Sequence, residues 1–169
     1  MAEQAGPGSG AVSWAQFEQE APELAATVRE RFAVRKHCTM ATLRRDGSPR
    51  ISGTEMELAD GQVRIGSMPG ARKAVDLLRD PRVALHSPTV DPPEGQQSSW
   101  AGEAKLAGVA AEERPAEAQP AEQEAAEQPP GGHTFRVDLT EVVHTRVDGD
   151  SLVVTSWHPG RGVQVTRRQ

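Results

Sequence analysis

Residues 64–85 read RIGSMPGARKAVDLLRDPRVAL and decide the fold. A short apolar strand leads into a Pro-Gly turn, and an amphipathic helix follows that begins with the basic pair Arg72 and Lys73. Pro81 ends that helix, and another strand follows it. The first turn of a helix has free backbone N–H groups and the positive end of the helix dipole, so basic residues there predict a site for a phosphate or a similar anion.

The spacing of apolar residues predicts which side of this helix is buried. The positions expected on the buried face are Ala71, Ala74, Val75 and Leu78. The positions expected to stay polar are Arg72, Lys73, Asp76 and Arg79. The alternative to a phosphate site is a solvated helix face in which Arg72 pairs with Asp76 four residues later.

Strands flank the helix on both sides. Three candidates precede it, split by Arg-Asp-Gly-Ser and Ala-Asp-Gly, which are strong hairpin signals. These three strands span residues 37–43, 49–58 and 62–67. The candidates after the helix span residues 82–87, 100–110, 134–147, 151–157 and 162–168. Many short strands with few helices predict a closed or nearly closed antiparallel barrel.

The ends and one internal segment differ from this pattern. Residues 1–12 are rich in small residues and predict a flexible tail, whereas Ser13 caps a first helix and Pro22 starts a second that runs to about residue 35. Residues 111–132 form a low-complexity insertion of Ala, Glu, Gln and Pro that cannot enter a core. We therefore expect one domain over residues 13–169, with that insertion in a loop.

Composition excludes several classes of protein. The 169 residues have a formal net charge of −5 and an isoelectric point near 5.6, which argues against a nucleic-acid partner because such proteins must neutralise phosphates. No signal peptide is recognisable, and no apolar run approaches the roughly 18 residues of a membrane helix, so we expect a cytoplasmic protein without membrane contact. Cys38, the single cysteine, lies in an apolar strand and predicts a buried, reduced thiol rather than a reactive one.

The histidines have no metal-ligand spacing, and no Ser/His/Asp or Cys/His arrangement can be argued, so we predict neither a metal site nor a catalytic side chain. The histidines are His37, His86, His133, His144 and His158.

Three segments resemble the pyridoxamine 5′-phosphate oxidase-like superfamily, split β-barrel proteins that bind FMN or the deazaflavin F420. They are ATLRRDGSPRIS at 41–52, GSMPGARKAVDLLRDPRVAL at 66–85 and GEAKLAGVA at 102–110. The similarity runs from Phe32 to the C-terminus, apart from the insertion. It implies a mainly β split barrel of six to eight antiparallel strands with flanking helices, and a homodimer with the cofactor at its interface.

The resemblance also assigns roles to residues. Arg72 and Lys73 match the pair that holds the cofactor phosphate, and Gly66 and Ser67 close the strand beside it. Residues 50–54 match a strand whose backbone edge lies along the flavin ring. A tryptophan and an arginine ten positions later reach in from the partner subunit in true oxidases, although the tryptophan of this chain would equally serve as core or dimer packing. The expected cofactor-binding residues are thus Arg50, Ile51, Ser52, Gly66, Ser67, Arg72, Lys73, Trp157 and Arg167.

Two substrate contacts of true pyridoxamine phosphate oxidases are replaced here. Their substrate lysine corresponds to Glu55, and their Arg-x-His pair corresponds to Val-Gln-Val at 163–165. A carboxylate in that place repels a substrate phosphate, so vitamin B6 oxidation is not expected.

Three functions remain open. The first is an oxidoreductase that moves hydride between FMN or F420 and a small organic acceptor; for F420, a basic patch such as Arg44, Arg45 and Arg50 could receive the longer tail. The second is a non-catalytic protein that binds or stores flavin or haem. The third is a cofactor-free interaction module.

Overall fold

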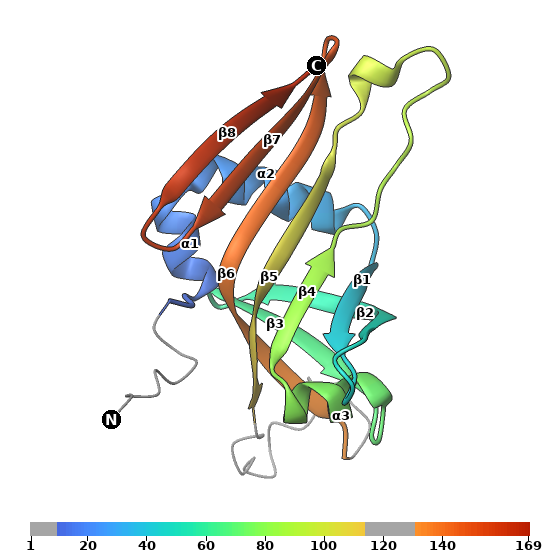
Figure 1. The fold of residues 1–169 in the computed structure, drawn as a ribbon, viewed down its shortest axis with the longest axis vertical. Helices are drawn as coiled ribbons and strands as arrows, with labels where there is room; N and C mark the ends of the chain where they lie inside the picture. Colours follow the sequence, from blue (N-terminus) through green and yellow to red (C-terminus); the bar gives the residue numbers. More distant parts are fainter. Residues whose placement is uncertain (1–9, 114–130) are drawn as a thin grey trace.

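The computed structural model describes residues 10–113 and 131–169. Within these residues the chain forms eight β-strands, three α-helices and one short 3₁₀ helix, η1 (Gln97–Ser99). Figure 1 shows the strands curling around a common core, with α1 and α2 on one side and α3 near one end. No helix in the described part is both long and apolar enough to cross a membrane.

Six of the strands close a barrel. The described strands pair antiparallel in the order β3-β2-β1-β4-β5-β6-β7-β8, and β3 also pairs with β6. β7 and β8 therefore continue the sheet as a hairpin outside the barrel (Figure 1). This confirms the predicted mainly antiparallel barrel with flanking helices. The strands are β1 His37–Leu43, β2 Pro49–Ala59, β3 Gln62–Ser67, β4 Arg82–His86, β5 Glu103–Glu113, β6 His133–Asp148, β7 Ser151–His158 and β8 Gly162–Arg168.

Both predicted hairpin turns form. Asp60 and Gly61, between β2 and β3, have φ angles of 52° and 70°, the left-handed conformation that a two-residue type I′ turn requires. Between β1 and β2 the Asp46 side chain accepts a hydrogen bond from the backbone N–H of Ser48 at 2.9 Å, and Gly47 has a φ of 83°. The turn chemistry thus fixes the three-strand meander β1-β2-β3.

Two N-terminal helices cover the core. Ser13 caps α1 (Trp14–Glu20) by accepting a hydrogen bond from Gln16, and Pro22 occupies the first turn of α2 (Pro22–Ala33). Phe17 of α1 packs against Trp157 of β7 with ring centroids 4.8 Å apart. The buried side chains of α2 are Leu24, Ala25, Val28 and Phe32.

The third helix, α3 (Arg72–Arg79), forms and buries Ala74 as predicted, but the rest of its buried face differs from the prediction. Leu77 is buried, whereas Val75 and Leu78 are 47% and 54% exposed. Asp76 is only 3% exposed. The predicted apolar face was therefore wrong for Val75 and Leu78, because a hydrogen-bonded carboxylate is buried beside Leu77 in their stead.

The predicted insertion at 111–132 begins too early. Strand β5 continues to Glu113, which is the register partner of Thr134 in β6 and forms an ion pair with Arg64 at 2.9 Å. The first residues assigned to the insertion therefore extend the barrel wall. Residues 114–130 lie outside the described part of the chain.

The predicted flexible tail, 1–12, ends in an ordered contact. The backbone N–H of Val12 donates to Leu139 O at 2.9 Å, and the N–H of Leu139 donates to Val12 O at 2.7 Å. Val12 is thus tied to β6, which corrects the prediction for this residue. Residues 1–9 lie outside the described part of the chain.

Candidate functional site

The barrel opens where β2 parts from β3. Residues 49–55 of β2 pair with β1, but β2 pairs with β3 only from Met56 to Ala59. Among the described strands, none pairs with the second edge of residues 49–55. The backbone N–H and C=O groups on that edge can therefore bind something other than a strand.

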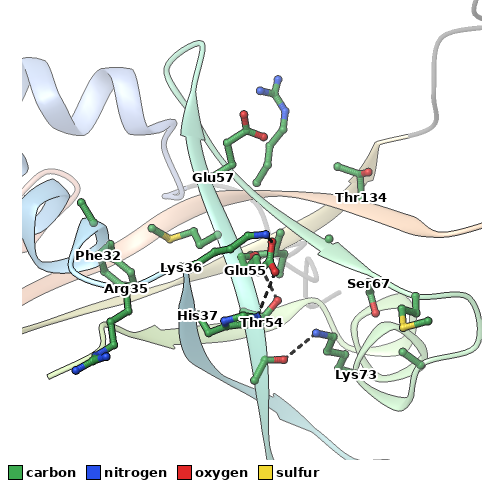
Figure 2. A pocket seen from close by; sticks show the side chains of 18 residues that line it. Phe32, Arg35, Lys36, His37, Thr54, Glu55, Glu57, Ser67, Lys73 and Thr134 are labelled. Carbon is green, nitrogen blue, oxygen red and sulfur yellow. Dashed lines mark hydrogen bonds and ion pairs between the residues drawn. The ribbon is translucent and has the colours of Figure 1, made fainter. Parts of the chain in front are cut away.

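A cleft of about 980 Å³ lies at this opening. Its walls are the end of α2 with the turn after it, the middle of β2, the end of β3 and the start of α3. Figure 2 shows Lys73 extending toward β2 at one side of this large cleft, and Lys36 and His37 converging on Glu55 at another. The cleft brings together Gly66, Ser67 and Lys73 of the predicted cofactor-binding set.

The start of α3 is built to attract an anion. Its N-cap is Ala71, which supplies no side-chain acceptor, and its first turn holds no acidic residue. The first backbone donors bonded to the cap are the N–H groups of Ala74 and Val75, so those of Arg72 and Lys73 make no backbone hydrogen bond within the described residues. The positive end of the helix is thus uncompensated, and an anion would complete it.

Lys73 is half-buried and positioned by the free edge of β2. Its Nζ donates to Gly53 O at 2.9 Å. Burial lowers the pKa of Lys73 from its usual value, although the Cys38 thiol and the Glu55 carboxylate oppose this shift. An ammonium group that is partly desolvated and has one of three donors engaged gains from a further anionic partner.

Ser67 adds an unpaired donor to the same cleft. Its Oγ is buried and makes no hydrogen bond to any residue that the structure describes. Buried hydroxyls are nearly always bonded, and an unbonded one at a concave site fits a missing ligand. A phosphate, which offers several acceptor oxygens, suits the combination of this hydroxyl, the Lys73 ammonium and the free N–H groups of α3.

Cys38 lies near Lys73 but is not an activated thiol. Its side chain is 7% exposed, and burial raises its pKa to about 11 even though the Lys73 charge acts in the opposite direction. The prediction of a buried thiol rather than a reactive one is thereby confirmed, and Cys38 offers no nucleophile to the cleft at neutral pH.

Another side of the large cleft carries both basic and acidic side chains. Glu55 Oε2 accepts from Lys36 Nζ at 3.2 Å, and Glu55 Oε1 lies 3.2 Å from His37 Nε2. All three side chains are at least half exposed. The Glu55 carboxylate is thus held by two neighbouring basic groups, which leaves it less repulsive to an anion than a free carboxylate.

A second cleft of about 670 Å³, the arginine cleft, lies on the other side of α3. It is formed by the β1–β2 turn, the start of β2 and one face of α3. Its lining residues are Arg44, Arg45, Asp46, Arg50, Arg72, Val75, Asp76 and Arg79.

The buried carboxylate of Asp76 organises this second cleft. Its Oδ2 accepts from Arg50 Nε at 2.6 Å and from Thr42 Oγ1 at 2.9 Å, and its Oδ1 lies 3.5 Å from Arg79 NH1. Burial acts to raise the pKa of Asp76, but these hydrogen bonds and the two arginine charges outweigh it, so the pKa lies below its usual value.

The side chains of the expected basic pair, Arg72 and Lys73, therefore line different clefts. Lys73 lines the large cleft, whereas the Arg72 side chain lines the arginine cleft together with Arg50. The alternative pair between Arg72 and Asp76 does not form, because Arg50 and Arg79 occupy that carboxylate. Arg72 makes no hydrogen bond or ion pair with any described residue.

Ile51 and Ser52 line neither of these two clefts. Both lie on the stretch of β2 that pairs with β1 but not with β3, and Ile51 is 75% exposed. At Ile51 and Ser52 the backbone edge of β2 adjoins the opening, whereas their side chains line neither cleft.

Trp157 and Arg167 line neither of the two clefts in this protomer. The Trp157 side chain is fully buried, packs on Phe17 and donates its Nε1–H to Glu20 Oε2 at 3.2 Å. It has no exposed surface with which to reach another molecule, so packing within its own protomer accounts for it. Arg167, on the exposed strand β8, forms an ion pair with Asp148 at 2.8 Å.

The histidines have separate structural partners. His86, His133 and His158 each approach a glutamate, at 3.2, 2.7 and 3.0 Å respectively. His144 is buried against Ala101 O, and burial lowers its pKa. The described residues contain no group of three or more His, Cys, Asp or Glu suited to a metal ion.

Sequence reasoning missed two parts of the site. The role of Gly53 as an acceptor for Lys73 depends on where β3 leaves β2, and no residue type marks that point. The arginine cleft was anticipated in part, because the basic patch expected at Arg44, Arg45 and Arg50 lines it. The burial of Asp76 beneath them was not foreseeable from helical periodicity.

Comparison with known proteins finds a family match over the part of the chain that forms both clefts. The sequence profile described as Pyridoxamine 5′-phosphate oxidase matches residues 24–146, which contain both clefts. No curated protein matches the chain significantly.

Solved structures of low sequence identity share the fold. A pyridoxamine 5′-phosphate oxidase-related, FMN-binding protein from Nostoc punctiforme has a TM-score of 0.59 at 12% identity, with 88% of this chain and 96% of that chain covered. PhzG from Burkholderia lata, in complex with tetrahydrophenazine-1-carboxylic acid, has a TM-score of 0.56 at 14% identity, covering 91% and 90%. A haem-binding protein from Mycobacterium smegmatis has a TM-score of 0.55 at 16% identity, covering 86% and 88%.

Proposed function

Because the chain belongs to the pyridoxamine 5′-phosphate oxidase family, we propose that it is an oxidoreductase that holds FMN or the deazaflavin F420 in the large cleft. The acceptor or donor of hydride is a small organic molecule. The Nostoc protein of the same fold is described as FMN-binding, which supports a flavin-type ligand for this chain.

One observation carries the proposal: the uncompensated start of α3 adjoins a cleft that already holds one unbonded hydroxyl and one ammonium group with donors to spare. Lys73 is partly desolvated there, and the Ser67 hydroxyl is buried without a partner among the described residues. A phosphate monoester would accept from both and from the free N–H groups of the helix. The phosphate of FMN or F420 is such a group.

The free edge of β2 supplies the second half of the site. The edge of residues 50–54 that faces away from β1 presents backbone donors and acceptors that no described strand uses. In the proposed complex these groups bond to the polar rim of the ring system, which orients it. When bound, the flavin or deazaflavin supplies the hydride chemistry, and the chain contributes binding, orientation and exclusion of water.

Arg72 contributes to the phosphate mainly by its charge and its backbone N–H group. Its guanidinium lines the neighbouring arginine cleft, so Lys73 makes the closer side-chain contact in the proposed complex. Exchanging Lys73 for alanine should accordingly reduce cofactor affinity more than exchanging Arg72.

The substrate differs from pyridoxamine 5′-phosphate. Glu55 stands where the family's substrate lysine would stand, and its neighbours Lys36 and His37 hold it at the cleft wall. A phosphorylated substrate would meet this carboxylate without the paired donors it needs. We expect an acceptor without a phosphate group.

A homodimer with the cofactor at its interface fits the surface around the opening. Ile51 is 75% exposed on β2, and Met68 is 69% exposed at the rim of the large cleft. Two large apolar side chains beside a binding cleft are typical of a surface covered by a partner. Sedimentation of the wild type and of Ile51→Lys tests this, with a dimer expected for the first and a shift toward monomer for the second.

The function itself is tested in two steps. The purified protein is first titrated with FMN and with F420, and one of the two should bind and shift its absorption spectrum. The bound, reduced cofactor is then offered a panel of small organic acceptors, and its reoxidation is followed. A protein that binds neither cofactor, or whose double variant Arg72→Ala/Lys73→Ala binds as well as the wild type, contradicts the proposal.

The second candidate is a protein that binds flavin or haem without turnover. His37 favours it, because this imidazole lines the large cleft and is 72% exposed on its side chain. The structural neighbour from Mycobacterium smegmatis is described as haem-binding. Haem titration of the wild type and His37→Ala separates the candidates: a Soret band that depends on His37 favours storage of haem.

A further inference from the structure

Three polar side chains from three strands lie in a row at the Ser67 end of the large cleft. Ser67 ends β3, His133 begins β6, and Glu112 lies next to the end of β5. Ser67 and His133 are register partners on antiparallel strands, so their side chains share a face of the sheet with Cβ atoms about 5 Å apart. His133 Nδ1 lies 2.7 Å from Glu112 Oε1. Figure 2 shows Ser67 on the same side of the cleft as Lys73.

The His133 ring is held on two sides. It stacks on Phe135 with ring centroids 6.0 Å apart, and only about a fifth of its side chain is exposed. A carboxylate only accepts hydrogen bonds, so Nδ1 carries a proton and donates it to Glu112. Nε2 makes no hydrogen bond to any residue within 10–113 and 131–169. Nε2 is therefore the ring nitrogen that remains to interact with the neighbouring Ser67.

The Ser67 hydroxyl has a single proton, and its direction depends on the imidazole. Its Oγ is buried and has no hydrogen-bond partner in the part of the chain that the structure describes. Toward a neutral imidazole the hydroxyl donates, because Nε2 is then an acceptor, and only its lone pairs face the cleft. Toward an imidazolium the hydroxyl accepts, because Nε2 then carries a proton, and its own O–H is free for an anion. Protonation of His133 thus decides whether Ser67 can donate to a phosphate oxygen.

We propose that His133 is a positioning residue for the phosphate bound in the large cleft: oriented by Glu112, it sets the direction of the Ser67 hydroxyl and makes the preference for a phosphorylated ligand depend on pH. This inference rests on the cofactor site proposed above. His133 does not touch the ligand and acts through Ser67. The preference is highest while His133 is protonated and falls as the imidazole loses its proton, which histidine does near neutral pH.

Other ionisable groups act near the same place, but independently of His133. Glu113 and Arg64 are paired with each other at 2.9 Å, and alternation along their strands places them on the other face of the sheet. On α3, Lys73 lines the cleft, and burial lowers its pKa, so its charge also weakens toward alkaline pH. A phosphate monoester gains its second charge near pH 6, which acts in the opposite direction. These contributions persist in a His133 variant, so that variant isolates the contribution of the imidazole.

The measured quantity is the phosphate preference, the factor by which FMN binds more tightly than riboflavin, or F420 more tightly than the corresponding deazaflavin without phosphate. It is determined by titration of the full chain at about pH 6 and about pH 8.5. From the lower to the higher pH, the preference of the wild type should fall at least fivefold more than that of His133→Phe, which keeps the ring stacked on Phe135 but has no donor. His133→Gln has an amide donor that does not titrate, so it should keep at pH 8.5 most of the preference it has at pH 6, and it carries the test if His133→Phe does not fold.

Two further variants locate the effect. His158→Phe is the matched control, because His158 also pairs with a glutamate, at 3.0 Å, but lines neither cleft, and it should show the pH dependence of the wild type. In a Ser67→Ala background, His133→Phe should change the preference less than twofold, since the hydroxyl through which it acts is gone. A wild type whose preference depends on pH as that of the folded His133 variants does overturns the role of His133 and leaves the proposed cofactor site intact. A wild type that binds neither cofactor, or that shows no phosphate preference at either pH, overturns both.

Discussion

The two clefts that adjoin α3 both gather basic groups, but these groups are stabilised differently in each cleft. In the large cleft a single lysine is partly desolvated, and the neighbouring Ser67 hydroxyl has no partner in the described structure. In the arginine cleft the charge is greater, but a buried carboxylate already binds two of the guanidiniums. The first cleft is incomplete without a ligand, whereas the second is assembled in advance.

The difference shows that basic residues adjacent in sequence can line separate clefts. Arg72 and Lys73 are neighbours at the start of one helix, and successive residues of a helix point about 100° apart. One side chain consequently enters each cleft, while their backbone N–H groups share the same helix end.

Removing the Asp76 carboxylate should have the largest effect on stability. It should disrupt the arginine cleft and leave the large cleft unchanged. Asp76→Ala leaves Arg50 and Arg79 without their buried partner and leaves the Thr42 hydroxyl unbonded, so we expect a loss of about 3 kcal/mol in the free energy of unfolding. Urea unfolding measures it. A loss below about 1 kcal/mol would mean that Asp76 does not organise this cleft.

The same carboxylate predicts a pH dependence. The pKa of Asp76 is lower in the folded protein than its usual value, so its stabilising contribution is present above the unfolded pKa and is lost as pH falls through the folded one. The stability difference between wild type and Asp76→Asn should therefore be constant at neutral pH and shrink below about pH 4. A difference that grows on acidification contradicts the assignment.

Exchanging Lys73 should weaken cofactor binding in the large cleft with little effect on stability. Lys73→Met removes a charge whose burial is unfavourable, so the unfolding free energy should stay within about 1 kcal/mol of the wild type. The affinity for the phosphorylated cofactor should fall about thirtyfold, as expected for one charge-assisted contact of about 2 kcal/mol. Lys36→Met, in the same cleft but bound to Glu55, is the control and should lower affinity less than threefold.

Neutralising the Glu55 carboxylate should have only a small effect on stability. Its two partners are at least half exposed, and such ion pairs contribute about 0.5 kcal/mol or less. Glu55→Gln should thus leave thermal unfolding nearly unchanged and should shift only the choice of acceptor. A change in melting temperature above about 4 °C would show that this pair supports the fold.

The smallest effect is expected from shortening the connection between β5 and β6. Glu113 and Thr134 are register partners on antiparallel strands, so a short turn can join their ends in place of residues 114–130. The unfolding free energy and the affinity for the cofactor should stay within experimental error. Loss of cofactor binding in this variant would assign a function to the deleted residues.

Much of the fold was readable from sequence because it rests on local chemistry. Asp60 and Gly61 fix one hairpin, Pro81 lies just beyond the end of α3, and Ser13 caps the first helix. Each of these acts within a few residues of itself, so the sequence alone carries the information.

The features that were missed depend on distant contacts. Asp76 is buried because Thr42 and Arg50, far from it in sequence, supply donors, and no helical pattern records that. Trp157 matches an interface tryptophan by spacing, yet α1 packs over it and encloses it. Spacing identifies which residues could act together, whereas tertiary packing decides which of them remain accessible.

The most direct test of the central claim compares each cofactor with its phosphate-free counterpart. FMN is titrated against riboflavin, and F420 against the corresponding deazaflavin without phosphate, in wild type and in Lys73→Met. The wild type should bind the phosphorylated form at least thirtyfold more tightly for one of the two pairs, and Lys73→Met should remove most of that preference. Equal affinity with and without the phosphate in the wild type would contradict a phosphate site at the start of α3.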